Sequence, residues 1–214
     1  MRSQREVPSV LLVGEFFVRS EPFSNGFVAR ALERRGLRVR LEPSVEFLQF
    51  ADYVNHKNGT KGGLADLLEH HVRNRLVALC HEAAGEVLGW PPHARMRDVF
   101  DAGAPYVREE LEVETPLTIG GSVDAWRRRR VDAVVSVGPL ECMPNKIAEA
   151  QFFHVAEVDG LHSLSLSYNG DPLDPVVIDN FAFEVTQRWR KGGAVPAVAA
   201  TEEAAPAAAT LEPT

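Results

Sequence analysis

The chain has 214 residues, of which 45% are hydrophobic and 25% are charged, and this balance is typical of a folded globular domain rather than of a disordered chain. Its formal net charge of −7 and its pI near 5.5 argue against a general nucleic-acid-binding surface, because neutralising phosphates requires clustered Lys and Arg. It has two cysteines, no export signal and no apolar run long enough to cross a bilayer. We therefore expect a cytoplasmic protein without a disulfide framework and without membrane or nucleic-acid contacts.

The amino-terminal part predicts a β-loop-α-β unit. The run "PSVLLVGE" at 8–15 is short, apolar and rich in Val and Leu, as is typical of a strand covered on both faces. After a loop, Ser24 or Asn25 can cap a helix whose apolar residues recur at helical spacing and which ends at Gly36. The run "LRVRLEP" at 37–43 then predicts a second strand.

The middle of the chain predicts two helices, at 44–57 and 64–88. In the second helix the apolar residues recur every three or four positions, which predicts that they form one stripe facing the core. The stripe consists of Leu64, Leu68, Val72, Leu76, Leu79, Cys80, Ala83 and Val87. We expect Cys80 to be packed inside as a small hydrophobe, because free cysteine is among the most buried residue types, and its alternative role is that of a thiol ligand.

The carboxy-terminal half predicts one further helix and two strand–helix pairs. The helix spans 115–130. A strand at 131–138 is followed by a helix at 145–158, and a strand at 161–168 is followed by a helix at 174–190.

Strands that alternate with helices form mainly parallel sheets with right-handed crossovers. We therefore predict a three-layer, Rossmann-like α/β fold with a mainly parallel sheet, flanking helices and a helical middle segment. One domain should span 1–190. The segment 191–214 consists largely of Ala, Pro, Glu and Thr without periodicity, and this composition predicts a disordered tail.

The loop "GPLECMPN" at 138–145 follows a predicted buried strand, at the edge of the sheet where α/β proteins bind ligands. Gly138 and Pro139 stop the strand, and Pro144 suits the first turn of the next helix. Cys142 then precedes a helix N-terminus, where free N–H groups and the helix dipole favour the thiolate that a metal or an electrophile requires. The alternative is a cysteine that occurs in a common Gly-Pro turn by chance.

Other candidate residues carry weaker signals. Arg19, in the loop after the first strand, lies at the same edge of the sheet and is a candidate anion-binding residue. The run 127–130 of four arginines closes a helix at the opposite edge, which indicates a solvated cap that complements the helix dipole. The chain has no glycine-rich phosphate loop and no paired-cysteine metal motif, and His70 and His71 are adjacent and so face different sides of their helix. We interpret all seven histidines as structural or surface residues.

Three segments of the chain together resemble a known family. They are "VGEFFVRSEPFSNGFVARALERRGLRVRLEP", "TIGGSVDAWRRRRVDAVVSVGPLECMPNKIAEA" and "LSLSYNGDPLDPVVIDNFAFEV". They resemble the carboxy-terminal region of acyl-CoA dehydratase activase-related proteins, which belong with the 2-hydroxyacyl-CoA dehydratase and benzoyl-CoA reductase family. The resemblance runs from about Val10 to about Arg188, is weakest in the middle helices and is most specific in the Cys-Met-Pro-Asn loop.

The resemblance implies a role for this loop. In the dehydratases, the cysteine of the corresponding loop ligates a cubane iron–sulfur cluster together with two further cysteines, and the cluster takes electrons from an ATP-driven activase and passes them to a CoA thioester. Only Cys142 matches these ligands, so the ligand set in this chain is incomplete. The residues Gly138, Pro139, Met143, Pro144 and Asn145 would shape the loop.

Three hypotheses follow for the function. The first is an accessory domain of an ATP-dependent dehydratase-type reductive system, in which Cys142 contributes to an iron–sulfur site shared with a partner. The second is a metal-free interaction module of the same system, and the third is a thiol-based enzyme with Cys142 as nucleophile, for which the sequence offers no base. The expected partner is a dehydratase- or activase-type subunit or a second copy of the chain, and an acyl-CoA is a candidate ligand.

Overall fold

Four parallel strands form the central sheet, in the order β2-β1-β3-β4. The computed structural model describes residues 7–59, 63–89, 94–111 and 113–192. The central strands are β1 (Ser9–Gly14) and β3 (Ala133–Pro139), and the edge strands are β2 (Arg38–Leu41) and β4 (Ser163–Tyr168). The predicted parallel α/β fold is therefore confirmed.

The burial of each strand follows its composition. All six residues of β1 are buried, and so are the first six of β3, as expected for apolar runs covered on both faces. In contrast, β2 alternates arginine with apolar residues and is partly exposed, which suits an edge strand. The register places Leu12 beside Val135 in β3 and beside Leu41 in β2.

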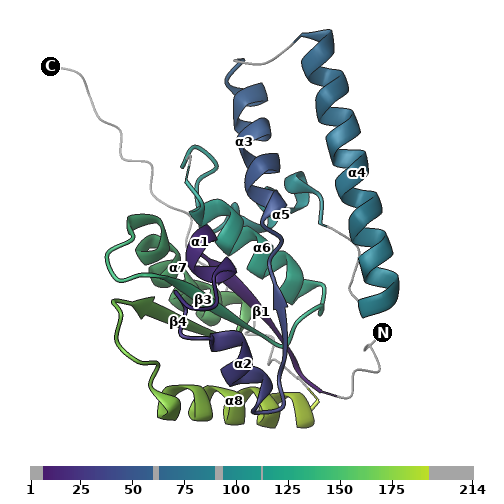
Figure 1. The fold of residues 1–214 in the computed structure, drawn as a ribbon. Coiled ribbons are helices and arrows are strands. Elements are labelled where there is room, and N and C mark those ends of the chain that lie inside the picture. Colours follow the sequence, from purple (N-terminus) through teal and green to yellow (C-terminus); the bar gives the residue numbers. More distant parts are fainter. Residues whose placement is uncertain (1–6, 60–62, 90–93, 112, 193–214) are drawn as a thin grey trace, which may run out of the picture.

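Two layers of helices cover the sheet (Figure 1). One face carries α2 (Val28–Glu33) and α8 (Pro175–Arg190), and the other face carries α6 (Thr115–Arg127) and α7 (Met143–Asp159). Two shorter helices, α1 (Phe16–Ser20) and α5 (Met96–Gly103), were not predicted from the sequence.

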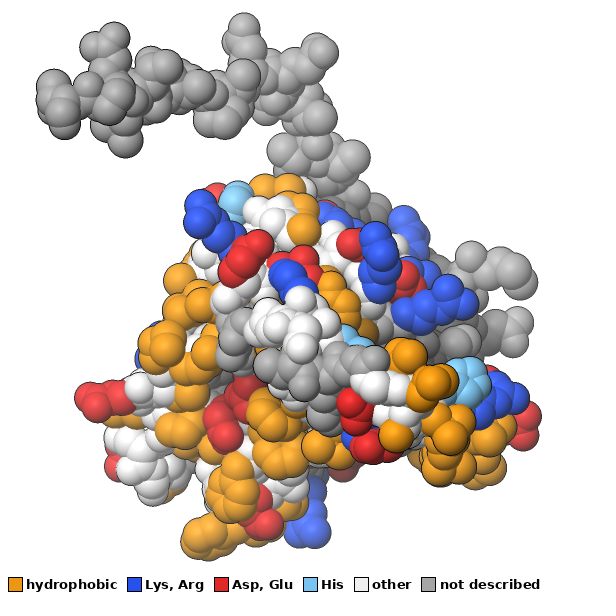
Figure 2. Space-filling model, turned by 90° about the horizontal axis from the view of Figure 1, so that it is seen from above, with side chains coloured by type: hydrophobic (Ala, Val, Ile, Leu, Met, Phe, Trp, Pro, Cys, Tyr) orange, Lys and Arg blue, Asp and Glu red, His pale blue; other side chains and the backbone are white. Residues whose placement is uncertain are grey.

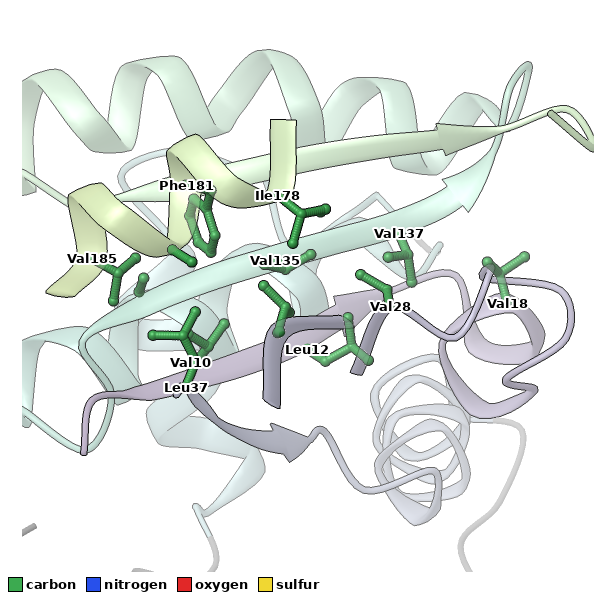
Figure 3. Close-up of a cluster of buried hydrophobic side chains, with 13 residues drawn as sticks. Val10, Leu12, Val18, Val28, Leu37, Val135, Val137, Ile178, Phe181 and Val185 are labelled. Atoms are coloured by element: carbon green, nitrogen blue, oxygen red, sulfur yellow. The ribbon is translucent and has the colours of Figure 1, made fainter. Parts of the chain in front are cut away.

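The face of the sheet that α2 and α8 cover is shown in Figure 3. Leu12 and Val135 point from the two central strands toward Val28 of α2 and toward Ile178 and Phe181 of α8. A second buried cluster lies on the opposite face and contains Leu11, Val134, Ile119, Val123, Phe152 and Val155. The sheet thus separates two apolar layers.

The helices α3 (Val45–Lys57) and α4 (Leu64–Leu88) stand beside each other and extend away from the sheet (Figure 1). The prediction that the apolar stripe of α4 faces the core is wrong, because no residue of α4 is buried. The prediction that Cys80 is packed inside is wrong too, because Cys80 is exposed. The polar side of α4 faces α3 instead. The periodicity therefore identified the apolar side of the helix correctly, but not the direction in which this side points.

The arginine run 127–130 closes α6 at the amino edge of the sheet, as predicted, and its first three residues are exposed. Two of these exposed side chains also pair with carboxylates. Arg127 Nη2 lies 2.8 Å from Asp159 Oδ2. Arg128 Nε lies 2.5 Å from the buried Asp124 Oδ1. These carboxylates add their negative charge to that of the carboxyl end of α6.

Within the described residues, no helix combines the length and the apolar character that crossing a membrane requires. The predicted tail, 191–214, lies outside the described residues except for its first two positions.

Candidate functional site

Cys142 is the residue that precedes α7, at the carboxyl edge of the sheet, as predicted. Its N–H donates to the carbonyl oxygen of Pro139 at 3.1 Å, and its own carbonyl accepts from the N–H of Lys146 at 2.9 Å. Pro144 occupies the first turn of α7. The side chain is partly exposed. The loop therefore presents the thiol at the surface instead of packing it.

The buried side chain of Asn145 packs against this loop. It is only 4% exposed, and Ser136 Oγ donates to its Oδ1 at 3.1 Å. A Cβ placed on Gly138 would lie 2.6 Å from Asn145 Cγ, so the amide fills the space that a side chain at Gly138 would need. Thr115 Oγ1 donates to the carbonyl oxygen of Pro144 at 2.9 Å and ties the loop to the start of α6. Gly138, Pro144 and Asn145 thus take part in contacts around this loop, and their loop-shaping roles, like those of Pro139 and Met143, stay predictions.

The ends of β1 and β3 meet beside this loop, where the connections of the sheet diverge to opposite sides. Such a switch point is where α/β sheets bind ligands. The N–H of Glu15 donates to the carbonyl oxygen of Val137 at 2.8 Å, so a backbone hydrogen bond joins the two strands beyond their last ladder pair. The Glu15 carboxylate accepts from the N–H of Val18 at 2.7 Å and starts α1 there. No sequence signal predicts α1, because this helix has only five residues and lacks an Asn, Asp, Ser or Thr cap.

Arg19, the predicted anion-binding residue, lies in α1 and is 5% exposed. Burial raises the pKa values of Glu46 and Glu114, and the nearby charge of Arg19 partly offsets both increases. Burial raises the pKa of Glu114, and nearby Glu15 raises it further. An anion role for Arg19 stays a prediction, and these carboxylates would compete with an added anion.

Two buried glutamates were missed by the sequence analysis. Glu42 follows β2 and is 7% exposed, and Glu46 lies in the first turn of α3 and is 5% exposed. Burial raises the pKa of Glu46 well above its ordinary value, and the adjacent Glu42 raises it further through its charge and a hydrogen bond. Both line a cavity of about 30 Å³, which has room for about one water molecule. A glutamate in a first helical turn is ordinary in sequence, so no signal indicated its burial.

Replacing Glu46 with glutamine should stabilise the protein at neutral and alkaline pH. Because the pKa of Glu46 is raised in the folded state, the folded protein binds this proton more tightly, and its stability falls as pH rises through that raised pKa. The glutamine variant does not lose stability in this way, because glutamine does not ionise. Its melting temperature at pH 8 should exceed that of the wild type by roughly 2–4 °C, the shift that about 1 kcal/mol gives in a chain of this size.

The gain should disappear as the pH falls to about 4 and below, because the unfolded wild type then also binds a proton at Glu46. Glu33→Gln, at an exposed position of α2, is the matched control and should change the melting temperature equally little at both pH values. A Glu46→Gln protein that is less stable than the wild type at pH 8 would contradict the assignment.

The side chains around Cys142 do not complete a metal site. Within the described part of the chain, no three His, Cys, Asp or Glu side chains come together as a set of metal ligands. Cys80 lies on the exposed side of α4 and belongs to no such set. His154 packs edge-on against Tyr106, and His162 stacks on Phe181. The residues that the structure describes therefore do not fit a complete iron–sulfur ligand set.

Exposed apolar side chains surround the loop instead. Phe17 on α1 is 61% exposed and Met143 on α7 is 58% exposed. Leu140 and Phe16 are also exposed, and the ring of Phe16 lies 5.9 Å from that of Phe47 on α3. We call these five residues the carboxyl-edge patch. Exposed apolar side chains that gather at one edge of a fold are typical of interaction sites.

In comparisons with known proteins, no protein-family model matches this chain, and neither does any curated protein or solved structure.

Proposed function

We propose that the chain is a non-catalytic interaction module of a 2-hydroxyacyl-CoA dehydratase- or activase-type reductive system, which docks on a partner subunit through the carboxyl-edge patch. The patch is the observation that carries this proposal. The patch exposes five large apolar side chains at one edge of the sheet. Covering them with a partner would lower the free energy, because apolar surface would leave water. The type of partner comes from the resemblance of the Cys142 loop and its flanking segments to that family.

At the carboxyl edge of the sheet, where α/β proteins usually bind small ligands, the protein's own groups fill part of the space. The hydrogen bond from the N–H of Glu15 to the carbonyl oxygen of Val137 extends the pairing of the two central strands, and Asn145 fills the space beside Gly138. Cys142 lines neither the small cavity near Glu46 nor the surface depression beside α2. These features favour binding to a surface over turnover of a small substrate.

A second candidate function keeps the same docking surface and adds a ligand role for Cys142. Its supporting observation is the position of the thiol, which is partly exposed at a helix start within the patch. A partner that covers the patch would meet this thiol and would have to supply the other ligands of an iron–sulfur site.

Binding to purified 2-hydroxyacyl-CoA dehydratase and to its activase, under anaerobic conditions, tests the docking. The double variant Phe17→Ser and Met143→Gln should bind at least tenfold more weakly than the wild type, because burying each side chain stabilises a complex by about 1.5–3 kcal/mol. The matched control is Phe183→Ser, at a position of α8 that is 64% exposed and remote from the patch. Equal weakening by both variants, or no binding of the wild type to either protein, would contradict the proposal.

The same complexes separate the two candidates. Iron and sulfide are measured in complexes of the wild type, of Cys142→Ser and of the control Cys80→Ser. Loss of iron in Cys142→Ser alone would support the ligand role. Equal iron in all three complexes would exclude that role and leave the docking module.

A further inference from the structure

Helix α4 has its apolar side turned away from the rest of the molecule. It lies at the margin of the structure, and Figure 2 shows hydrophobic side chains gathered at several places on the surface seen from above. Among the stripe residues, Leu64 is 90% exposed, Leu68 65%, Val72 47%, Leu76 57%, Leu79 43% and Val87 85%. A single exposed leucine is ordinary, but a continuous stripe along a 25-residue helix marks a surface that another chain covers.

The opposite side of α4 is held against α3 by polar contacts. Arg73 and His70 pair with Asp52 of α3, which is only 4% exposed. Gln49 Nε2 donates to Asn74 Oδ1 at 3.1 Å. Rotating α4 to bury its leucines would break these contacts and leave Asp52 buried without its cation. The outward direction of the stripe is therefore fixed by the network on the other side.

The charged residues beside the stripe are arranged so that two antiparallel copies of α4 would have complementary charges. His71, Arg75, Glu82 and Glu86 each directly precede a stripe residue, so all four lie on the same flank of the stripe. When two identical helices pack antiparallel about a two-fold axis, like flanks face each other. In one such register, each residue lies opposite the residue of the second copy whose number, added to its own, gives 157. Arg75 then faces Glu82 of the second copy, and His71 faces Glu86 of the second copy. Both pairings occur twice, by symmetry.

The same register interdigitates the apolar residues. Val72 falls between Ala83 and Val87 of the second copy, and Leu76 falls between Leu79 and Ala83 of the second copy. The two helices would overlap from residue 69 to residue 88, a length of about 30 Å. A parallel pair would instead bring unlike flanks together, and the other flank carries only Glu69 among the exposed charged residues of α4.

We propose that two copies of this chain associate through an antiparallel pairing of their α4 helices, in the register that places Arg75 opposite Glu82. The proposal does not depend on the proposed function, because α4 contributes no residue to the carboxyl-edge patch. In this register the two Cys80 thiols lie on facing flanks, about 4.5 Å apart along the helix axis.

Sedimentation equilibrium of the full chain tests the association. The wild type, with a subunit mass of 23.6 kDa, should sediment as a dimer at micromolar concentration. Leu79→Glu should give a folded monomer, because this side chain is already 43% exposed and is not needed for the fold. Phe183→Glu, on α8, is the matched control and should remain a dimer. A monomeric wild type at 100-fold higher concentration would overturn the proposal and leave the stripe for another occupant.

Charge exchange tests the register. Arg75→Glu alone creates two like-charge pairs and should weaken the dimer at least tenfold, and the double variant Arg75→Glu with Glu82→Arg should restore it. In a Cys142→Ser background, a short bis-maleimide should cross-link Cys80 to Cys80 of the second copy. Failure of the exchange to restore the dimer, or cross-linking that persists in Leu79→Glu, would overturn the antiparallel pairing.

Discussion

Replacing Gly14 with alanine should lower the free energy of unfolding by more than about 4 kcal/mol, a loss that few single substitutions cause. Gly14 ends β1 with φ at +107°, a conformation that L residues rarely adopt. A Cβ there would lie 2.1 Å from the carbonyl oxygen of Val137. The backbone cannot retreat, because β1 is hydrogen-bonded to β2 and β3 on both sides. Urea denaturation followed by circular dichroism measures the loss.

Gly36→Ala is the matched control for this substitution. Gly36 also has a positive φ, of +80°, but a Cβ there would meet no atom within 4 Å. It should therefore cost only the conformational strain, roughly 1–2 kcal/mol. Equal losses from the two variants would show that the close approach of β1 to β3 is not what requires glycine.

Gly120→Ala should also destabilise the protein strongly, by roughly 3 kcal/mol. In an ordinary helix interior this change stabilises by about 1 kcal/mol. Here α6 crosses α5 so closely that a Cβ on Gly120 would lie 2.2 Å from the carbonyl oxygen of Val99. The two helices would have to separate and loosen the cluster of Phe50, Phe100 and Leu117 between them and α3. The midpoint of urea unfolding measures the effect.

The neighbouring Gly121→Ala separates helix propensity from helix contact. The nearest atoms to a Cβ on Gly121 would all belong to the carboxylate of Glu42, with Oε1 at 3.2 Å, and this carboxylate is the end of a flexible side chain. Gly121→Ala should therefore change the stability little in either direction. A loss comparable to that of Gly120→Ala would refute the assignment of the cost to the crossing of α5 and α6.

The sheet and the placement of Cys142 could be predicted because their signals are local. An apolar run bounded by Pro8 and Gly14 has the length of a strand and not of a helix. The Gly-Pro pair that ends β3 and the proline that begins α7 fix the chain direction on both sides of Cys142. The alternation of strands and helices then determines a parallel sheet, which puts this loop at its carboxyl edge.

The orientation of α4 and the burial of Glu46 could not be predicted, because both depend on contacts distant in sequence. Periodicity shows that Leu68 and Leu76 share one side of a helix, but it contains no information about which element that side meets. Glu46 is buried by α1 and by the end of β2, and its own sequence neighbours look like an ordinary amphipathic helix. Helix α5 was missed for a related reason, since its contact with α6 depends on glycines in the partner helix.

The position of β1 in the sheet has a consequence for the synthesis of the protein. One neighbour, β2, follows β1 within about thirty residues, whereas the contact of Ser9 with Asp132 at the start of β3 spans 123 residues. At about 5–20 residues per second, a ribosome needs roughly 6–25 s to make that intervening chain. During this time the nascent β1 has an apolar edge with no strand to pair with, and such edges recruit other chains. The amount of folded protein that a cell obtains therefore depends on what shields this edge until β3 emerges.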